Sequence, residues 1–222
     1  MKRRSLPSLV VAVTLLAGPS AVRAAGPVAL PQPDTSGKVA LERAVAQRRS
    51  VREYAPGALT LGEIGQLMWV AQGITSPDGK RATPSARAVY PLQVWLVARD
   101  VTGLAPGVYR YLPKEHALQG EPAGLRDSVV TAARGQASIV QAAAIVAVAG
   151  DSVLAAAKFR GFAERWLGME AGFVVQDVYL ECTALGLGTV MVGGFDDFAA
   201  RRALGLPAGW QALALMPVGR RK

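Results

Sequence analysis

The sequence is poor in cysteine and histidine, with one of each among its 222 residues. The single cysteine, Cys182, excludes intramolecular disulfides and cysteine-rich metal sites. The single histidine, His116, argues against histidine-centred catalytic triads and histidine metal sites, so no metal site is predicted. Cys182 falls on the apolar face of a predicted helix and is expected to pack as a small buried hydrophobe. His116 lies in the polar stretch 113–118, where we expect a surface loop.

Long basic runs are also missing, although the formal net charge is +9. The cations come in short clusters at residues 2–4, 48–49, 201–202 and 220–222. Such clusters fit small anionic ligands at least as well as nucleic acid, and no nucleic-acid partner is expected. About half of the sequence (51%) is hydrophobic, which supports a substantial core and excludes global disorder.

The first 24 residues have the pattern of an export signal peptide. Three cations at residues 2–4 precede an apolar segment at 9–17 that is too short to span a bilayer comfortably, and small residues flank a cleavage position after Ala24. An uncleaved membrane anchor remains the alternative. Residues 3–6, Arg-Arg-Ser-Leu, are partly similar to a twin-arginine signal, a route that carries folded proteins. We expect a periplasmic or secreted protein without stable membrane insertion, whose formal charge falls from +9 to +5 on cleavage because residues 1–24 hold four cations and no acid.

The remaining chain divides into a predicted linker at 25–37 and one domain at 38–222. Three prolines and little periodicity predict the linker. Helices are predicted at 38–49 with Ser36 as its cap, at 61–72 capped by Thr60, at 125–134 with a further turn at 138–141, and at 198–204. Strands are predicted at 92–98, 107–112, 143–149, 189–192 and 211–218. This order predicts an α+β fold with one central sheet.

One long helix is predicted to organise the domain, because no proline occurs from Phe162 to Leu185. At 1.5 Å per residue it would be roughly 35 Å long. Apolar residues at three- and four-residue steps give it one continuous buried face: Ala163, Leu167, Ala171, Val174, Val178 and Cys182. Met169 and Phe173 add apolar surface elsewhere, so we expect burial on more than one side. Gly186 and Gly188 end the helix ahead of the strand at 189–192.

Arginines and glycines supply the candidate binding residues. Arg48-Arg49-Ser50-Val51-Arg52 follows the first helix and offers forked donors that suit phosphate and carbonyl oxygens, although a solvated basic corner explains these residues equally well. Gly193-Gly194 marks a place where the backbone turns or closely approaches another group.

Four motifs, taken in order, resemble the flavin-dependent nitroreductase family. They are the Arg-Arg-Ser-Val-Arg stretch at 48–52, Pro-Ser-Ala-Arg-Ala-Val-Tyr-Pro at 84–91, Met-Glu-Ala-Gly-Phe-Val-Val-Gln-Asp at 169–177, and the Gly-Leu-Gly-Thr and Gly-Gly-Phe turns at 186–195. The resemblance covers about residues 38–219. The form of the second motif, with Gly-Val-Tyr-Arg-Tyr at 107–111, is most similar to the azoline-oxidising dehydrogenase branch of streptolysin-S type, which aromatises thiazolines and oxazolines in ribosomal peptides.

The resemblance implies a nitroreductase-like central mixed sheet surrounded by helices. It also implies an FMN-binding homodimer with two active sites at the subunit interface, where the long helix is a main contact. Hydride would pass through the flavin in a ping-pong reaction, from NAD(P)H or an organic substrate to a small-molecule acceptor, so no catalytic side chain is predicted. The residues that match cofactor-contacting positions are Arg48, Arg49, Ser50, Arg52, Pro84, Ser85, Arg87, Gly193, Gly194, Arg220 and Arg221.

Three positions depart from the family pattern and keep other functions open. Asp177 stands where this branch commonly has asparagine, Ala88 where many relatives have an asparagine, and Arg87 replaces a usual glycine and could clamp the phosphate or crowd the site. A flavin- or ligand-binding protein without turnover is the main alternative, and a basic interaction domain without flavin is another. NAD(P)H as the donor conflicts with export, because soluble nicotinamides are scarce outside the cytoplasm.

Overall fold

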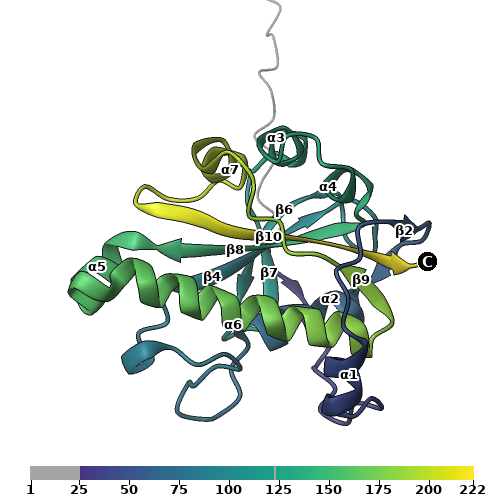
Figure 1. The fold of residues 1–222 in the computed structure, drawn as a ribbon, viewed down its shortest axis with the longest axis horizontal. Helices are drawn as coiled ribbons and strands as arrows, with labels where there is room; N and C mark the ends of the chain where they lie inside the picture. Colours follow the sequence, from purple (N-terminus) through teal and green to yellow (C-terminus); the bar gives the residue numbers. More distant parts are fainter. Residues whose placement is uncertain (1–25, 123) are drawn as a thin grey trace, which may run out of the picture.

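The computed structural model describes residues 26–122 and 124–222, so the predicted signal peptide at 1–24 lies outside the described residues. The fold is α+β, as predicted. An eight-stranded sheet has the order β1-β7-β6-β4-β8-β10-β2, with β9 also paired to β10 (Figure 1). Its strands are β1 (Val28–Ala29), β2 (Tyr54–Ala55), β4 (Leu92–Ala98), β6 (Gly107–Leu112), β7 (Ala117–Gly120), β8 (Ala144–Asp151), β9 (Leu187–Thr189) and β10 (Trp210–Arg221). The pairings in this sheet are antiparallel, and a small parallel sheet joins β3 (Leu59–Thr60) to β5 (Val101–Thr102).

Helices cover both faces of the sheet, as Figure 1 shows. They are α1 (Leu41–Gln47), α2 (Leu61–Gln72), α3 (Arg126–Ala132), α4 (Ala137–Gln141), α5 (Ser152–Phe159), α6 (Ala163–Ala184) and α7 (Asp197–Ala203), with 3-10 turns at Ala86–Ala88 and Arg160–Phe162. One core lies between the sheet and α2 and α6, and a second lies between the sheet and α3 and α7. In the described part of the chain, no helix is both long and apolar enough to cross a membrane.

The central strand β8 explains the two cores. Its sequence is a run of small apolar residues, and successive side chains of a strand point to opposite faces. Val146 and Val148 accordingly belong to the core under α6, whereas Ile145 and Ala147 belong to the core under α3 and α7. The predicted burial of this strand on both faces is confirmed.

The long helix is confirmed as α6, whose 22 residues span about 33 Å. Its predicted inner face is buried at Leu167, Ala171, Val174, Val178 and Cys182. Met169 and Phe173 are 54% and 41% exposed in the single protomer, so their predicted burial is not provided within one chain. Gly186 follows the helix with φ of 69°, which lets β9 begin at once at Leu187. The strand is therefore earlier than the predicted 189–192, and only Val192 adds an isolated bridge, to Leu215.

The capping predictions have different outcomes. Thr60 forms a capping box with Glu63 at the start of α2, as expected from its hydroxyl and the acid three residues later. Helix α1 is shorter than the predicted 38–49, and its cap residue, Ala40, has no capping side chain. The predicted cap, Ser36, instead hydrogen-bonds to Asp34 through its amide and hydroxyl, a local turn that competes with helix capping.

The segment predicted as a linker packs on the domain. Val28 and Ala29 form an edge strand against β7, and Leu30 is buried in the core under α2. The Asp34 amide donates to the Gln66 side chain at 2.9 Å. The prolines do not prevent this arrangement, because an edge strand needs few backbone donors. His116 lies in the turn before β7 as expected, where its Nδ1 is 2.8 Å from the Tyr111 hydroxyl.

Candidate functional site

The arginine-rich stretch crosses from α1 to the end of α6. Arg48 caps the C-terminus of α1, and the Arg49 guanidinium donates to the Ala46 and Arg48 carbonyls. The Val51 amide then donates to the Thr189 carbonyl at 2.8 Å. This bond ties the stretch to β9, which leads directly into the glycine turn.

Tyr179 of α6 joins the arginine stretch to the glycine turn. Its hydroxyl accepts a hydrogen bond from the Met191 amide at 2.8 Å and lies 3.1 Å from Ser50 Oγ. The Arg48 guanidinium lies over its ring, 5.0 Å from the centroid. Sequence reasoning missed this residue. A tyrosine on a mostly buried helix needs a partner for its hydroxyl, and that requirement was the available signal.

A groove of about 500 Å³ lies beside this junction. Arg52, Glu53, Gly193 and Gly194 line it, together with residues 136–138 and 190–192. A Cβ added at Gly194 would meet no atom within 4 Å, and one at Gly193 would meet only Met191 Sδ at 3.5 Å. The backbone of the turn therefore faces open space, and a flat ligand could approach it closely.

The groove is lined by one arginine and one glutamate, Arg52 and Glu53, and Arg48 and Arg49 precede them in the chain. Within residues 26–122 and 124–222, Arg48, Arg49 and Arg52 take part in no ion pair, whereas Glu53 is paired with Lys222 at 2.8 Å. The Arg52 guanidinium, which has no ion-pair partner, lies beside an open backbone and suits a ligand that carries phosphate at one end. The residues present thus fit a phosphate-bearing cofactor such as FMN.

The Pro84–Ser85 segment lies elsewhere in the protomer. It lines a second cavity of about 320 Å³ with Trp166, Met169, Glu170 and Phe173 of α6. Glu170 precedes Tyr179 by nine residues, a separation of about 13 Å along the helix. Within one chain, the structure does not bring Pro84 and Ser85 to the groove beside Gly193.

Arg87 and Arg220 have partners that differ from the predictions. Arg87 is exposed, donates to the Lys158 carbonyl at 3.3 Å, and does not line the groove beside Gly193. Arg220 donates to both carboxylate oxygens of Glu63 and to the Ala58 carbonyl. Burial raises the pKa of Glu63, but hydrogen bonds from Arg220 and Thr60 outweigh it and hold that pKa below its ordinary value. Arg220 is thus engaged in an ion pair with Glu63 in the protomer.

Two remaining predicted positions are in open or half-buried surroundings. Arg221 is exposed at the end of β10. Asp177 is half-buried on α6, between the cavity at Glu170 and the junction at Tyr179, and burial raises its pKa to about 6. No hydrogen bond from the described residues reaches its carboxylate, so nothing in the protomer offsets that burial.

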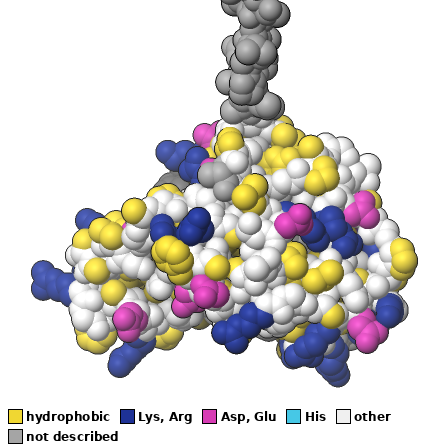
Figure 2. Space-filling model, turned by 90° about the horizontal axis from the view of Figure 1, so that it is seen from above, with side chains coloured by type: hydrophobic (Ala, Val, Ile, Leu, Met, Phe, Trp, Pro, Cys, Tyr) yellow, Lys and Arg dark blue, Asp and Glu magenta, His cyan; other side chains and the backbone are white. Residues whose placement is uncertain are grey.

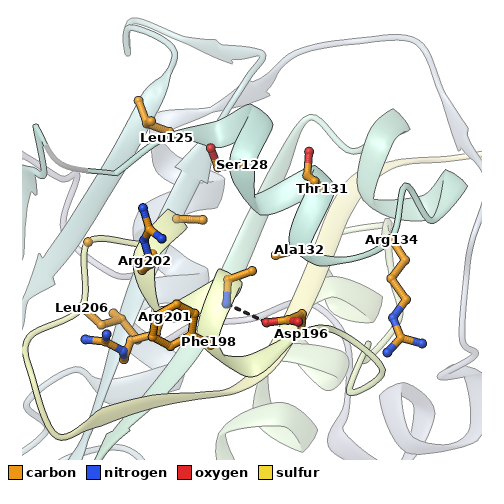
Figure 3. Close-up of a pocket in the computed structure, with 13 residues that line it drawn as sticks. Leu125, Ser128, Thr131, Ala132, Arg134, Asp196, Phe198, Arg201, Arg202 and Leu206 are labelled. Carbon is orange, nitrogen blue, oxygen red and sulfur yellow. Dashed lines mark hydrogen bonds between the residues drawn. The ribbon is translucent and has the colours of Figure 1, made fainter.

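A cavity of about 850 Å³ lies between α3 and α7 and contains none of the predicted site residues (Figure 3). Arg201 and Arg202 extend along the Phe198 ring there, at 5.4 and 5.8 Å from its centroid. The Asp196 carboxylate accepts from the Ala199 amide and caps α7. On the face seen in Figure 2, basic side chains alternate with acidic and hydrophobic ones and form no continuous basic patch among the residues drawn in colour.

Comparisons with known proteins agree on one family. The profile of the Nitroreductase family matches residues 45–220. The nitroreductase-type protein MJ1384 of Methanocaldococcus jannaschii is 39% identical over 189 residues, which are 83% of this chain and 92% of that protein. The crystal structure of a nitroreductase-type protein from Ralstonia eutropha JMP134 has a TM-score of 0.73 at 23% identity and covers 88% of this chain and 90% of its own.

The fold is also shared with a protein-modifying assembly. A chain of the E. coli microcin synthetase McbBCD complex, with truncated pro-MccB17 bound, has a TM-score of 0.67 at 22% identity and covers 81% of this chain and 73% of its own. At that identity the likeness concerns the fold alone. From the family profile, the MJ1384 relative and the shared fold, the chain belongs to the Nitroreductase family of oxidoreductases.

Proposed function

We propose that the protein is an FMN-dependent oxidoreductase with ping-pong hydride transfer. A donor such as NAD(P)H or an organic substrate would deliver a hydride, and a small-molecule acceptor would receive it in a second step. The observation that carries the proposal is the junction at Tyr179. It ties the arginine stretch, whose Arg52 lines the groove, to a glycine turn without side chains.

In this proposal the arginine stretch supplies the charge that binds the cofactor, and the glycine turn supplies the space for it. Arg48, Arg49 and Arg52 supply cations for the phosphate dianion. Ser50, held by Tyr179, adds a hydroxyl donor or acceptor, and the Gly193–Gly194 backbone leaves room for the ring edge. Bound flavin would supply the hydride chemistry, and the protein would supply orientation and electrostatics.

We further propose that the active unit is a homodimer formed through α6. Met169 and Phe173 are exposed apolar residues on this helix, and a Cβ added at Gly168 or Gly172 would meet nothing within 4 Å, so another helix could approach closely. A two-fold interface uses the same patch on both subunits. Glu170, which lies beside the Pro84 segment, and Tyr179 are about 13 Å apart along α6. An antiparallel pairing of two α6 helices would therefore bring the Pro84 segment of one subunit to the groove of its partner.

We place the protein in the azoline-oxidising branch. The Pro-Ser-Ala motif at 84–86 and the Gly-Val-Tyr-Arg-Tyr hairpin at 107–111 support this placement. The fold shared with the McbBCD chain is compatible with it. A thiazoline- or oxazoline-bearing peptide would then be the hydride donor. Such a donor also suits the proposed periplasmic or secreted location, where NAD(P)H is scarce.

The decisive measurement is the visible absorption spectrum of the purified protein before and after anaerobic addition of NADH, NADPH or an azoline peptide. Flavin bands that bleach with one donor are the expected result. Bands that no donor bleaches would favour the ligand-binding alternative. Two features motivate that alternative: the half-buried Asp177 carboxylate, and Arg87, which donates to the Lys158 carbonyl. A colourless protein that FMN cannot stabilise against heat would contradict both. Light scattering gives the subunit number, and a monomer would contradict the dimer.

A further inference from the structure

Glu170 is the only charged side chain that is buried in the described part of the chain, with 4% of its surface exposed. A carboxylate removed from water is costly unless hydrogen bonds or cations replace its hydration. No ion pair with a described residue involves Glu170. Its stabilisation must come from hydrogen-bond donors close to it.

Those donors come from one loop. The Ala86 amide donates to Glu170 Oε1 at 2.8 Å. The neighbouring Ser85 side chain also favours the ionised carboxylate and so lowers its pKa, and the Ser85 oxygen accepts from the Tyr90 amide at 2.8 Å. Burial raises the pKa of Glu170, and the bonds from Ala86 and Ser85 partly oppose that rise. The groups that stabilise the carboxylate thus come from two neighbouring residues of one loop, Ala86 and Ser85.

The same loop has a backbone that needs support. Arg87, Ala88 and Tyr90 have φ angles of 56°, 52° and 52°, in the left-handed region that residues with a side chain rarely adopt. One end of the loop is fixed by Thr83, whose hydroxyl is bound by Gln72. The bonds to Glu170 fix the segment that follows. Without them, the strained backbone has an alternative set of extended conformations available.

We propose that Glu170 is a positioning residue, which holds the Pro84–Ser85 segment in the conformation that meets the cofactor across the subunit interface. The inference rests on the proposed function for the identity of that cofactor, but the anchoring itself is a property of the single chain. A carboxylate suits the task because both of its oxygens accept. A glutamine would keep one acceptor oxygen, but its NH2 group would replace the second oxygen and could not accept a hydrogen bond from the loop.

Four variants separate anchoring from general stability. Glu170→Leu removes both acceptors at similar volume, and Glu170→Gln keeps one. Glu164→Gln is the matched control, because Glu164 is an exposed acid on the same helix and belongs to no part of the proposed site. Ser85→Ala provides an independent change that leaves α6 intact if Glu170→Leu folds poorly.

The test is amide hydrogen exchange of the purified protein, combined with FMN titration by fluorescence. We expect exchange at residues 84–90 to be about tenfold faster in Glu170→Leu, as for the loss of one hydrogen bond to a charged acceptor, with a smaller change in Glu170→Gln and Ser85→Ala. Strand β8 and the Glu164→Gln variant should be unchanged. FMN should dissociate about tenfold more readily from Glu170→Leu, with partial rescue in Glu170→Gln.

The outcomes distinguish the anchoring of the loop by Glu170 from the effect of that anchoring on FMN binding. Unchanged exchange at 84–90 in Glu170→Leu overturns the anchoring role, whatever the flavin content. Faster exchange spread over β8 as well means that Glu170 serves general stability and also overturns it. Faster loop exchange with unchanged FMN affinity overturns the link to the cofactor. A wild-type protein that binds no FMN contradicts the proposed function, while loop exchange in the variants still tests the anchor.

Discussion

Replacing Asp177 by asparagine should stabilise the protein above pH 6 and leave its stability unchanged near pH 4. Burial raises the pKa of this carboxyl from 3.8 to about 6. Above pH 6 the folded protein therefore holds an ionised carboxylate that would prefer water. Below about 3.8 the carboxyl is protonated in both the folded and the unfolded state, and the penalty disappears.

The size of the effect follows from the shift. At 1.36 kcal/mol per pKa unit, a rise of this size corresponds to about 3 kcal/mol. Because Asp177 is partly exposed, solvent screening reduces the expected gain for Asp177→Asn to about 1–1.5 kcal/mol. For a chain of this length, that gain raises the melting temperature by about 3–5 °C.

The assay is the melting temperature of wild type and Asp177→Asn from pH 4 to pH 8, followed by circular dichroism. The difference should grow between pH 4 and 6 and then stay constant. Glu164→Gln, which removes an exposed acid from the same helix, should show no such step. A pH-independent difference, or a less stable Asp177→Asn variant at pH 8, would refute the argument that an uncompensated carboxylate is buried there.

Three further variants test the groove. Arg48→Ala should weaken FMN binding by about ten- to a hundredfold, because a charge-assisted hydrogen bond contributes on the order of 1.5–3 kcal/mol. Equilibrium dialysis would measure this loss, and unchanged binding would mean that Arg48 does not contact the phosphate. Gly193→Val should abolish FMN binding without altering the melting temperature, since the added side chain meets only Met191, and a fully flavinated variant would place the ring away from this turn. Tyr179→Phe leaves the Met191 amide without its partner and should cost about 1–3 kcal/mol in denaturant unfolding, whereas an unchanged midpoint would mean that the hydroxyl does not join the two segments.

The elements that sequence reasoning located are those set by local patterns. Helix α6 follows from the spacing of Leu167, Ala171 and Val174, and the start of α2 follows from Thr60 and Glu63 three residues later. Strand β8 follows from an uninterrupted apolar run. In each case neighbours in the sequence determine the conformation, so no knowledge of the tertiary structure was needed.

The missed elements depend on distant partners. Strand β1 exists because Val28 and Ala29 meet Leu118 and Ala117, and its two residues carry no periodicity. Arg220 was predicted as a phosphate ligand because the sequence does not reveal that Glu63 lies beside it. Helix α5 is an exception, because it was not predicted although a local signal was present: Asp151 caps it through the Leu154 amide.

The candidate site was predictable as a set of segments but not as an arrangement. The arginine stretch and the glycine turn were found by residue type, since phosphate needs cations and a close approach needs glycine. Their meeting point at Tyr179 could not be found that way, because it requires Ser50 and Met191 to converge on one hydroxyl. The sequence also could not show that the Pro84 segment lies away from the groove in the protomer, because that depends on how distant segments pack.

The position of β10 determines when the site can form during folding. Strands β1, β7, β6, β4 and β8 can pair with one another as soon as they have been synthesised, but β2 and β9 pair only with β10, which comes last in the chain. The β2–β10 pairing joins Ala55 to Arg220, and contacts over such a long sequence separation are slow to form. The arginine stretch lies between α1 and β2 and is tied to β9, so its final geometry must wait for β10. A nascent or truncated chain would thus hold most of its sheet while still lacking the groove.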